Sequence, residues 1–297
     1  MVKTTGLKMD VVIEHKCELG EGPLWDAKCK VICWIDILKG EIHEYSLQQK
    51  KHRTISVHQM IGSVAVCANG NFIAALQSGF GFVDRISGEV TMIADPEAHL
   101  PANRFNEGKC DPAGRFVAGT MSLSEDPQEG SVYILENNLS VTKKIENVTI
   151  SNGMAWSKDH QTFYYIDTPT LEVSAYDYNK STGHIKNKKT IIKIPKEDGS
   201  PDGMTIDNEG MLWVAHWDGW QITRWNPGTG KKLYHIKMPV ARVTSCTFGG
   251  ENLNDLYITT ARKGLSEDEL QKQPLAGSLF VIRSCGFKGM PAFEFNT

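Results

Sequence analysis

The sequence contains no apolar run long enough to cross a bilayer, which takes about 20 residues in a helix. Its first ten residues, MVKTTGLKMD, are polar and lack the apolar core of a signal peptide. Neither sign of charge dominates, because 32 basic residues stand against 35 acidic ones, and no long run of like charge occurs. These absences argue against a membrane surface or a nucleic acid as partner.

Cysteine is scarce and follows no recognisable pattern. The seven cysteines, an odd number, are scattered from Cys17 to Cys285, which predicts reduced thiols in a cytoplasmic protein. Cys29 and Cys33 are the closest pair, but no second pair of Cys or His follows at the spacing of a zinc site. Buried, unreactive thiols are therefore a better interpretation than zinc binding.

Long amphipathic helical patterns are also absent, and only the segment 265–273 is typical of one or two helical turns. Short alternating segments occur instead, for example QITRWNP (221–227), GSVYIL (130–135) and EVSAYDYN (172–179). Alternation with a period of two indicates β-strands whose two faces differ in polarity. The sequence therefore predicts an all-β protein.

The strands recur with a long period. The apolar or aromatic centres of six of them are spaced by 40, 42, 49, 48 and 44 residues and fall at Trp34, Ala74, Phe116, Tyr165, Trp213 and Tyr257. This is the period of a four-stranded propeller blade, and six blades fill the chain. We predict one domain over residues 1–297, a six-bladed β-propeller with a metal site in its central channel, preceded by a flexible leader at 1–9.

A propeller must close its ring, because an open sheet edge invites aggregation. The apolar run 11–13 is expected to add a strand to the last blade, which otherwise ends with the segment 277–282. Two separate β-domains are the alternative, but the even spacing and the lack of a linker disfavour them.

A carboxylate or amide residue precedes glycine at four related places in the repeat: Glu21-Gly22, Glu107-Gly108, Asn152-Gly153 and Asp202-Gly203. Equivalent positions of successive repeats lie at equivalent places in space, so the polar side chains are expected to meet in the channel. Each pair alone is compatible with an ordinary β-turn, since Asp, Asn and Gly favour turns. Their shared phase in the repeat favours a site.

The chemistry of these side chains points to a cation. Glu21, Asn152 and Asp202 supply hard oxygen donors, which suit Ca²⁺, Mg²⁺, Mn²⁺ or, less selectively, Zn²⁺. Without a cation, neighbouring carboxylates repel one another and one of them tends to stay protonated. Nearby, the guanidinium of Arg104 can bind hydroxyl groups or a developing oxyanion, or form a salt bridge on the channel wall.

Five segments in order, spanning almost the whole chain, resemble the senescence marker protein/gluconolactonase/luciferin-regenerating-enzyme family: LGEGPLWD (19–26), NRFNEGKCDPAGRFVAGTM (103–121), SNGMAWSKDHQTFYYID (151–167), SPDGMTID (200–207) and TSCTFGGENLNDLYITTAR (244–262). The resemblance implies a hydrolase of sugar lactones, such as gluconolactone or xylonolactone, that uses one divalent metal. We expect Ca²⁺, with Zn²⁺, Mg²⁺, Mn²⁺ and Fe²⁺ also compatible, and a monomer or weak homo-oligomer.

Matching the family's motifs residue by residue implies that Glu21, Asn152 and Asp202 are the metal ligands. Asp202 is implied to act also as the general base. Arg104 and Asn106 are implied to bind substrate.

The sequence departs from some relatives at two places. Glu107 fills a position that is often Asp, and we expect it beside the substrate. After AGTM, where some relatives have an acidic residue that touches substrate, the register places Ser124, and a shift of one residue would bring Glu125 into that role. His216 is expected either to line the mouth of the pocket or to be packed in the wall.

Two other functions remain open. One is a non-catalytic propeller that binds calcium or a metabolite, and the other is a hydrolase of different esters, such as phosphotriesters. A serine acyl-enzyme route lacks support, since no G-x-S-x-G motif is present. Sugar specificity is expected to depend on the rim loops 53–63, 122–130 and 263–276.

Overall fold

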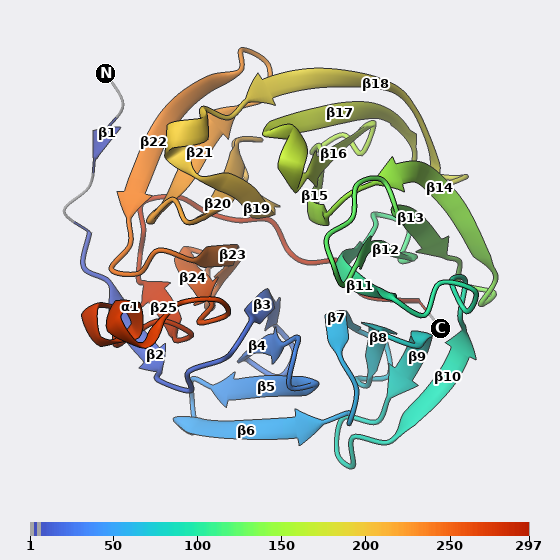
Figure 1. Ribbon diagram of the computed structural model, residues 1–297, viewed down its shortest axis with the longest axis horizontal. Helices are drawn as coiled ribbons and strands as arrows, with labels where there is room; N and C mark the ends of the chain where they lie inside the picture. Colours follow the sequence, from blue (N-terminus) through green and yellow to red (C-terminus); the bar gives the residue numbers. More distant parts are fainter. Residues whose placement is uncertain (1–2, 5–6, 297) are drawn as a thin grey trace.

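Six β-sheets surround a central channel in the computed structural model, which describes residues 3–4 and 7–296 (Figure 1). The innermost strand of each sheet borders the channel, and the following strands lie progressively further out (Figure 1). The predicted all-β, six-bladed propeller is thus confirmed. All six residues that set the repeat spacing are buried in the second strand of their blade.

The first three blades follow the chain order. Blade 1 comprises β3 (Gly20–Asp26), β4 (Val31–Asp36), β5 (Glu41–Ser46) and β6 (Lys51–Ser56). Blade 2 comprises β7 (Ile61–Val66), β8 (Phe72–Leu76), β9 (Gly79–Val83) and β10 (Val90–Ala94). Blade 3 comprises β11 (Asn103–Cys110), β12 (Phe116–Ser122), β13 (Gly130–Leu135) and β14 (Val141–Val148).

The next blades have the same antiparallel order. Blade 4 comprises β15 (Ser151–Trp156), β16 (Thr162–Asp167), β17 (Glu172–Asn179) and β18 (His184–Lys193). Blade 5 comprises β19 (Ser200–Ile206), β20 (Leu212–Trp217), β21 (Gln221–Asn226) and β22 (Lys231–Lys237). Blade 6 takes β23 (Val243–Gly249), β24 (Asp255–Thr260) and β25 (Leu279–Ile282) from the end of the chain.

The N-terminal part of the chain closes the ring. Strand β2 (Asp10–Ile13) pairs antiparallel with β25, with Asp10 opposite Val281, and becomes the outer strand of blade 6. The predicted closure by the run 11–13 is therefore confirmed. Strand β1 (Lys3–Thr4) pairs in parallel with β22. Residues 1–2 and 5–6 lie outside the described part of the chain, and the leader at 1–9 stays a prediction.

Helical structure is minor and local. The helix α1 (Glu267–Lys272) begins at a capping box, in which the Ser266 hydroxyl accepts from the Glu269 N–H and the Glu269 carboxylate accepts from the Ser266 N–H at 2.8 Å. The 3₁₀ turn η1 (Thr168–Thr170) lies between β16 and β17 of blade 4, and the 3₁₀ turn η2 (Lys196–Asp198) connects blade 4 to blade 5. In the part of the chain that the structure describes, no helix has the length and apolarity needed to cross a bilayer.

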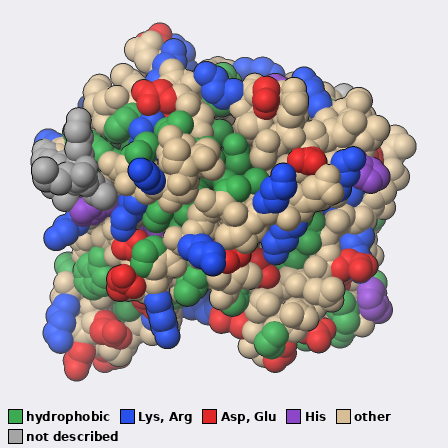
Figure 2. Space-filling model, turned by 90° about the horizontal axis from the view of Figure 1, so that it is seen from above, with side chains coloured by type: hydrophobic (Ala, Val, Ile, Leu, Met, Phe, Trp, Pro, Cys, Tyr) green, Lys and Arg blue, Asp and Glu red, His purple; other side chains and the backbone are tan. Residues whose placement is uncertain are grey.

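Apolar side chains fill the space between neighbouring blades. One cluster joins Ile35 and Ile42 of blade 1 to Val64 and Phe72 of blade 2, all at most 6% exposed. On the surface, Lys and Arg side chains are interspersed with Asp and Glu over the face seen in Figure 2. This mixture agrees with the balanced composition of the sequence.

All seven cysteines are free thiols, and six of them are buried as expected. Cys29 is exposed, so the expectation of buried thiols was wrong at this position. It lies in the turn between β3 and β4, where its backbone N–H donates to the Asp26 carboxylate at 2.9 Å.

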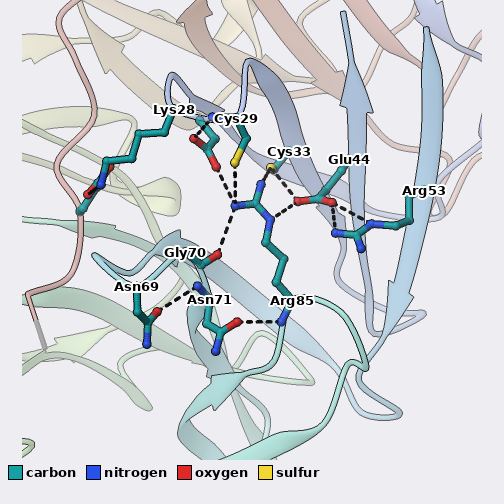
Figure 3. Close-up of polar contacts among 11 residues, drawn as sticks. Lys28, Cys29, Cys33, Glu44, Arg53, Asn69, Gly70, Asn71 and Arg85 are labelled. Carbon is teal, nitrogen blue, oxygen red and sulfur yellow. Dashed lines mark hydrogen bonds and ion pairs between the residues drawn. The ribbon is translucent and has the colours of Figure 1, made fainter. Parts of the chain in front are cut away.

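A buried ion-pair network joins blades 1 and 2 (Figure 3). Arg85, which follows β9, donates from Nε to Glu44 Oε1 at 2.5 Å and from Nη1 to Asp26 Oδ2 at 2.7 Å. The same Nη1 donates to the Gly70 carbonyl at 3.2 Å, and Arg53 holds the other oxygen of Glu44. Because one guanidinium satisfies two buried carboxylates, it fixes the two blades against each other.

Replacing this arginine should destabilise the ring strongly. We expect Arg85→Met to lower the free energy of unfolding by about 3–5 kcal/mol, because Asp26 would stay buried without its guanidinium partner. Denaturant-induced unfolding measures the change. Arg283→Met is the matched control, since the Arg283 side chain is 53% exposed and its ion pair with Asp255 is long, at 3.6 Å. Equal losses in the two variants would contradict this role for Arg85.

Candidate functional site

The innermost strands all begin at one end of the channel, which we call the rim end. In each blade the register between the innermost strand and its neighbour shifts, for example between Phe105 and Glu107 and between Pro201 and Met204. Such irregularities interrupt regular pairing and re-aim side chains, and they are frequent beside functional sites. Here they coincide with the residues predicted to face the channel.

Close packing requires the glycine in three of the four predicted dipeptides, at Gly108, Gly153 and Gly203. A Cβ atom at Gly153 would lie 2.8 Å from the Asp202 carbonyl oxygen, and one at Gly203 would lie 2.1 Å from Ser245 Oγ. Neighbouring innermost strands therefore approach too closely for any side chain there. This approach brings the polar residue of each pair close to its counterparts.

Four polar side chains form what we call the channel cluster: Glu21 (β3), Glu107 (β11), Asn152 (β15) and Asp202 (β19). Each is at most 7% exposed. Burial, and then the charges of Asp202 and Glu107, raises the pKa of Glu21 well above its usual value. Burial and the charge of Glu107 likewise raise the pKa of Asp202. The carboxylates thus repel one another electrostatically, as expected for groups that converge from three blades.

Two oxygens of the channel cluster lack a hydrogen-bond donor although they are buried: Asn152 Oδ1 and Glu107 Oε2. A hydrogen bond fixes the orientation of the Asn152 amide, because its Nδ2 donates to Thr168 Oγ1 at 3.0 Å. Thr168 in turn donates to the Pro201 carbonyl at 2.8 Å. An unpartnered buried oxygen is costly, and these oxygens with the carboxylates of Glu21 and Asp202 fit a divalent cation that prefers hard donors.

Arg104 and Asn106 lie on β11 beside the channel cluster. Arg104 is 4% exposed and donates from Nη1 to Asn106 Oδ1 at 2.7 Å. Burial lowers the pKa of Arg104 to about 10, while the negative charges of Glu125, Glu21 and Asp202 act in the opposite direction. Asn106 Nδ2 donates to the Ser151 carbonyl at 2.8 Å. Asn106 thus holds Arg104 and ties blade 3 to blade 4.

The loop after β12 places Ser124 and Glu125 differently. The Ser124 hydroxyl donates to Asp126 Oδ2 at 2.6 Å, so its hydrogen is already engaged. Glu125 adopts a left-handed backbone conformation (φ 61°) and its charge acts on Arg104. Its carboxylate lies 3.3 Å from Lys263 Nζ, which joins two of the predicted rim loops. Of the two residues, Glu125 is the one that acts electrostatically on Arg104.

A cavity of 730 Å³ occupies the opposite end of the channel. The later residues of the innermost strands line it, together with the C-terminal segment Met290–Glu294. Figure 1 shows the C-terminal segment crossing the central opening, and bridges from Gly289 to Asp207 and from Phe295 to Cys67 anchor it to two blades. This segment therefore covers the channel at the end away from the rim.

Sequence reasoning missed two residues of this site. Lys109 donates from Nζ to the Met204 carbonyl, and its charge lowers the pKa of Glu107 and Glu21 against the larger effect of burial. Its position two residues after Glu107 on a strand, and hence on the same face, was an available signal. Thr168, which orients Asn152, lies in a turn and offered no such signal.

His216 belongs to the wall and not to the pocket mouth. Its side chain is fully buried in blade 5, with Nε2 2.6 Å from Thr223 Oγ1. Burial lowers the pKa of His216 to about 4, so the ring is neutral at neutral pH. Of the two roles expected for this histidine, the structure supports packing.

The fold and the channel cluster describe a six-bladed propeller with an oxygen-rich polar centre. The chain belongs to the SMP-30/gluconolactonase/LRE-like family, whose model matches residues 19–262, as its motifs indicated. It is 40% identical to regucalcin from Danio rerio over 294 residues, 98% of this chain and 99% of that protein.

Solved structures agree with this assignment. A luciferin-regenerating enzyme is 32% identical with a TM-score of 0.92, over 98% of this chain and 100% of that one. A calcium-binding protein, regucalcin from Agrobacterium tumefaciens, is 26% identical with a TM-score of 0.94, over the whole of both chains.

The raised carboxylate pKa values predict a pH dependence of stability in metal-stripped protein. Folded Glu21 keeps a proton that the unfolded chain releases near about pH 4.3, so folding stability falls as the pH rises above that value. Glu21→Gln should make this fall shallower above about pH 5. Denaturant unfolding at a series of pH values measures the slopes. Glu267→Gln, on exposed α1, should keep the wild-type slope; an unchanged slope in Glu21→Gln would contradict the coupling.

Proposed function

We propose that this protein is a metal-dependent lactonase that hydrolyses sugar lactones, aldonolactones such as gluconolactone or xylonolactone, to the aldonic acids. Membership of a family that includes gluconolactonases supports the reaction class. The observation that carries the proposal is the convergence of buried, partly unpartnered oxygens beside a buried arginine. A site of this kind can hold a cation and a hydroxyl-rich substrate together.

Glu21, Asn152 and Asp202 would hold the metal, with Glu107 next to them. When bound, a divalent cation supplies Lewis acidity toward the lactone carbonyl and favours the ionised carboxylates. Ca²⁺ suits the donor set, and the similar Agrobacterium tumefaciens regucalcin is described as calcium-binding. Mg²⁺, Mn²⁺, Zn²⁺ and Fe²⁺ are compatible with the same oxygens.

The chain's own residues then have distinct tasks. Asp202 accepts a proton from the water whose oxygen attacks the carbonyl carbon, and the proton passes to the ring oxygen as the ester bond breaks. Arg104 donates to sugar hydroxyls, and Asn106 holds its guanidinium in place. Glu125 at the rim accepts hydrogen bonds from the same hydroxyls. Each group acts from a rigid strand or an anchored loop, which favours precise positioning.

Activity should depend on both the metal and Asp202. Metal-stripped protein should hydrolyse gluconolactone or xylonolactone only at the spontaneous rate, and added Ca²⁺ or another divalent ion should restore turnover in a pH-indicator assay. Asp202→Asn should lower kcat by about 10²–10⁴-fold with the circular dichroism spectrum unchanged. Asp177→Asn, at an exposed position of β17 away from the channel, should retain full activity.

Other outcomes of this assay identify the alternatives. Calcium binding without turnover of any lactone would establish a non-catalytic binding protein, an alternative that the calcium-binding Agrobacterium tumefaciens regucalcin favours. Turnover of other esters, such as a phosphotriester, but not of lactones would move the chemistry to that substrate. Near-wild-type kcat in Asp202→Asn would reject the base assignment.

The rim contacts predict which of two neighbouring residues binds sugar. Glu125→Gln should raise KM by roughly tenfold with a smaller change in kcat, because it removes a charged acceptor whose charge acts on Arg104. Ser124→Ala should leave KM almost unchanged, since its hydroxyl already donates to Asp126. Steady-state kinetics on both variants make the comparison. A larger effect on KM from Ser124→Ala would assign the contact to the serine.

A further inference from the structure

Three histidines meet outside the channel, at the outer part of blade 1. His15 lies between β2 and β3, His43 in β5 and His52 in β6; we call them the histidine cluster. One ring nitrogen from each lies within 4.8 Å of one from each of the others. None of the three belongs to the channel cluster or to the rim loops around it.

The sheet register explains how two of these rings meet. Tyr45 pairs with His52 and His43 pairs with Thr54, so His43 and His52 are diagonal neighbours on one face of the blade. Trp34 pairs with His43 across β4 and β5, and its ring stacks on both histidines at centroid distances of 5.0 and 5.3 Å. The cluster therefore has a rigid aromatic floor.

The third histidine comes from the segment that closes the ring. The ring of His15 packs 4.2 Å from that of His43 between centroids. Just before it, Val12 and Ile13 of β2 pack against the apolar cluster that contains Trp34. The histidine cluster thus lies at the junction between the closing strand of blade 6 and the outer strands of blade 1.

The hydrogen-bonding capacity of these rings is incompletely used. His43 is fully buried, and its Nε2 has no hydrogen-bond partner. The nearest carboxylate oxygen, Glu41 Oε2, lies 3.5 Å from that nitrogen and 3.3 Å from His15 Nε2. His15 Nε2 is thus within hydrogen-bond distance of this oxygen, whereas His43 Nε2 stays without a partner. A buried polar atom without a partner needs an explanation, and an ion is one of the usual ones.

Hydrogen bonding leaves a nitrogen of His43 free for an ion. A neutral imidazole offers one nitrogen lone pair, and this is the form that binds a metal ion. When His43 Nδ1 carries the ring proton it can donate to Thr54 Oγ1, 3.1 Å away, and the lone pair then lies on the buried, unpartnered Nε2.

We propose that His15, His43 and His52 bind one transition-metal ion of the Zn²⁺ class, with Glu41, whose Oε2 approaches His15 and His43, available as a further ligand. Three imidazoles and one carboxylate suit zinc, whereas Ca²⁺ and Mg²⁺ prefer oxygen donors alone. Tetrahedral bonds of 2.0–2.1 Å place ligand atoms about 3.3 Å apart, close to the 3.3 and 3.5 Å separations between Glu41 and the two ring nitrogens.

This ion would act as a structural cross-link. It would tie the connector that follows β2 to β5 and β6, so that the closing strand of blade 6 and the outer edge of blade 1 could not separate independently. An ion that binds only the folded chain stabilises it in proportion to its occupancy. The site is therefore expected to raise the unfolding temperature, and it takes no part in lactone hydrolysis.

The test uses full-length, metal-stripped protein carrying Glu21→Gln and Asp202→Asn, which removes two ligands from the channel. Cys29, the exposed thiol among the seven, is alkylated beforehand so that it cannot contribute a ligand. Zn²⁺ is titrated against a chromophoric chelator, Co²⁺ is followed by its visible absorption, and the unfolding temperature is recorded with and without Zn²⁺. Zinc analysis after dialysis gives the number of ions per chain.

We expect one Zn²⁺ per chain, a tetrahedral Co²⁺ spectrum and a higher unfolding temperature with Zn²⁺. His15→Gln and His52→Gln, at partly exposed positions, should each weaken Zn²⁺ binding by at least about tenfold and reduce the thermal shift at a fixed Zn²⁺ concentration. His184→Gln, at an exposed position of β18, should behave as the unmutated histidine background. Absence of Zn²⁺ binding, or equal binding in all three histidine variants, would overturn the proposal.

Discussion

The innermost strands of this propeller pack so closely that neighbouring blades leave no space for a side chain at Gly153 or Gly203. This constraint determines what the channel can contain. Strands that approach to this distance bring residues of equivalent repeat position within electrostatic reach, although about 50 residues separate them in the chain. The ring can hold them there only when it is closed, which the pairing of Asp10–Ile13 with Leu279–Ile282 achieves.

Close packing has an electrostatic cost at the centre. The carboxylates of Glu21, Glu107 and Asp202 are all nearly inaccessible to water, and their mutual repulsion adds to the cost of burial. Lys109 offsets part of this cost from within the channel. The unpartnered oxygens of Glu107 and Asn152 remain, and an arrangement that is unfavourable for the folded chain alone is favourable for cation binding. The buried carboxylates thus lower the stability of the folded chain and at the same time preorganise a site, as is common at functional sites.

The sequence predicted the parts of this structure that repeat. The period of the strand centres led to six blades, and the phase of four dipeptides led to the buried polar cluster, because a repeat converts sequence position into position in space. Contacts between unlike elements could not be predicted. Arg85 contacts Asp26, which lies 59 residues away in the sequence, and Thr168 contacts Asn152, 16 residues away. Neither sequence separation matches the repeat period. The histidine cluster has no regular spacing either, since its members come from a connector and two strands.

Donor chemistry would keep the two proposed metal sites distinct. The channel offers carboxylate and amide oxygens, whereas the histidine cluster offers imidazole nitrogens and one carboxylate, so hard cations would favour the first and Zn²⁺ the second. Zinc also binds oxygen sites, but a chain with both sites would fill the nitrogen-rich site first as zinc becomes available. The channel would then remain open to a more weakly held, exchangeable cation. A structural ion at the ring junction and an exchangeable one at the centre would make separate demands on the same fold: the first on its closure, and the second on the spacing of its innermost strands.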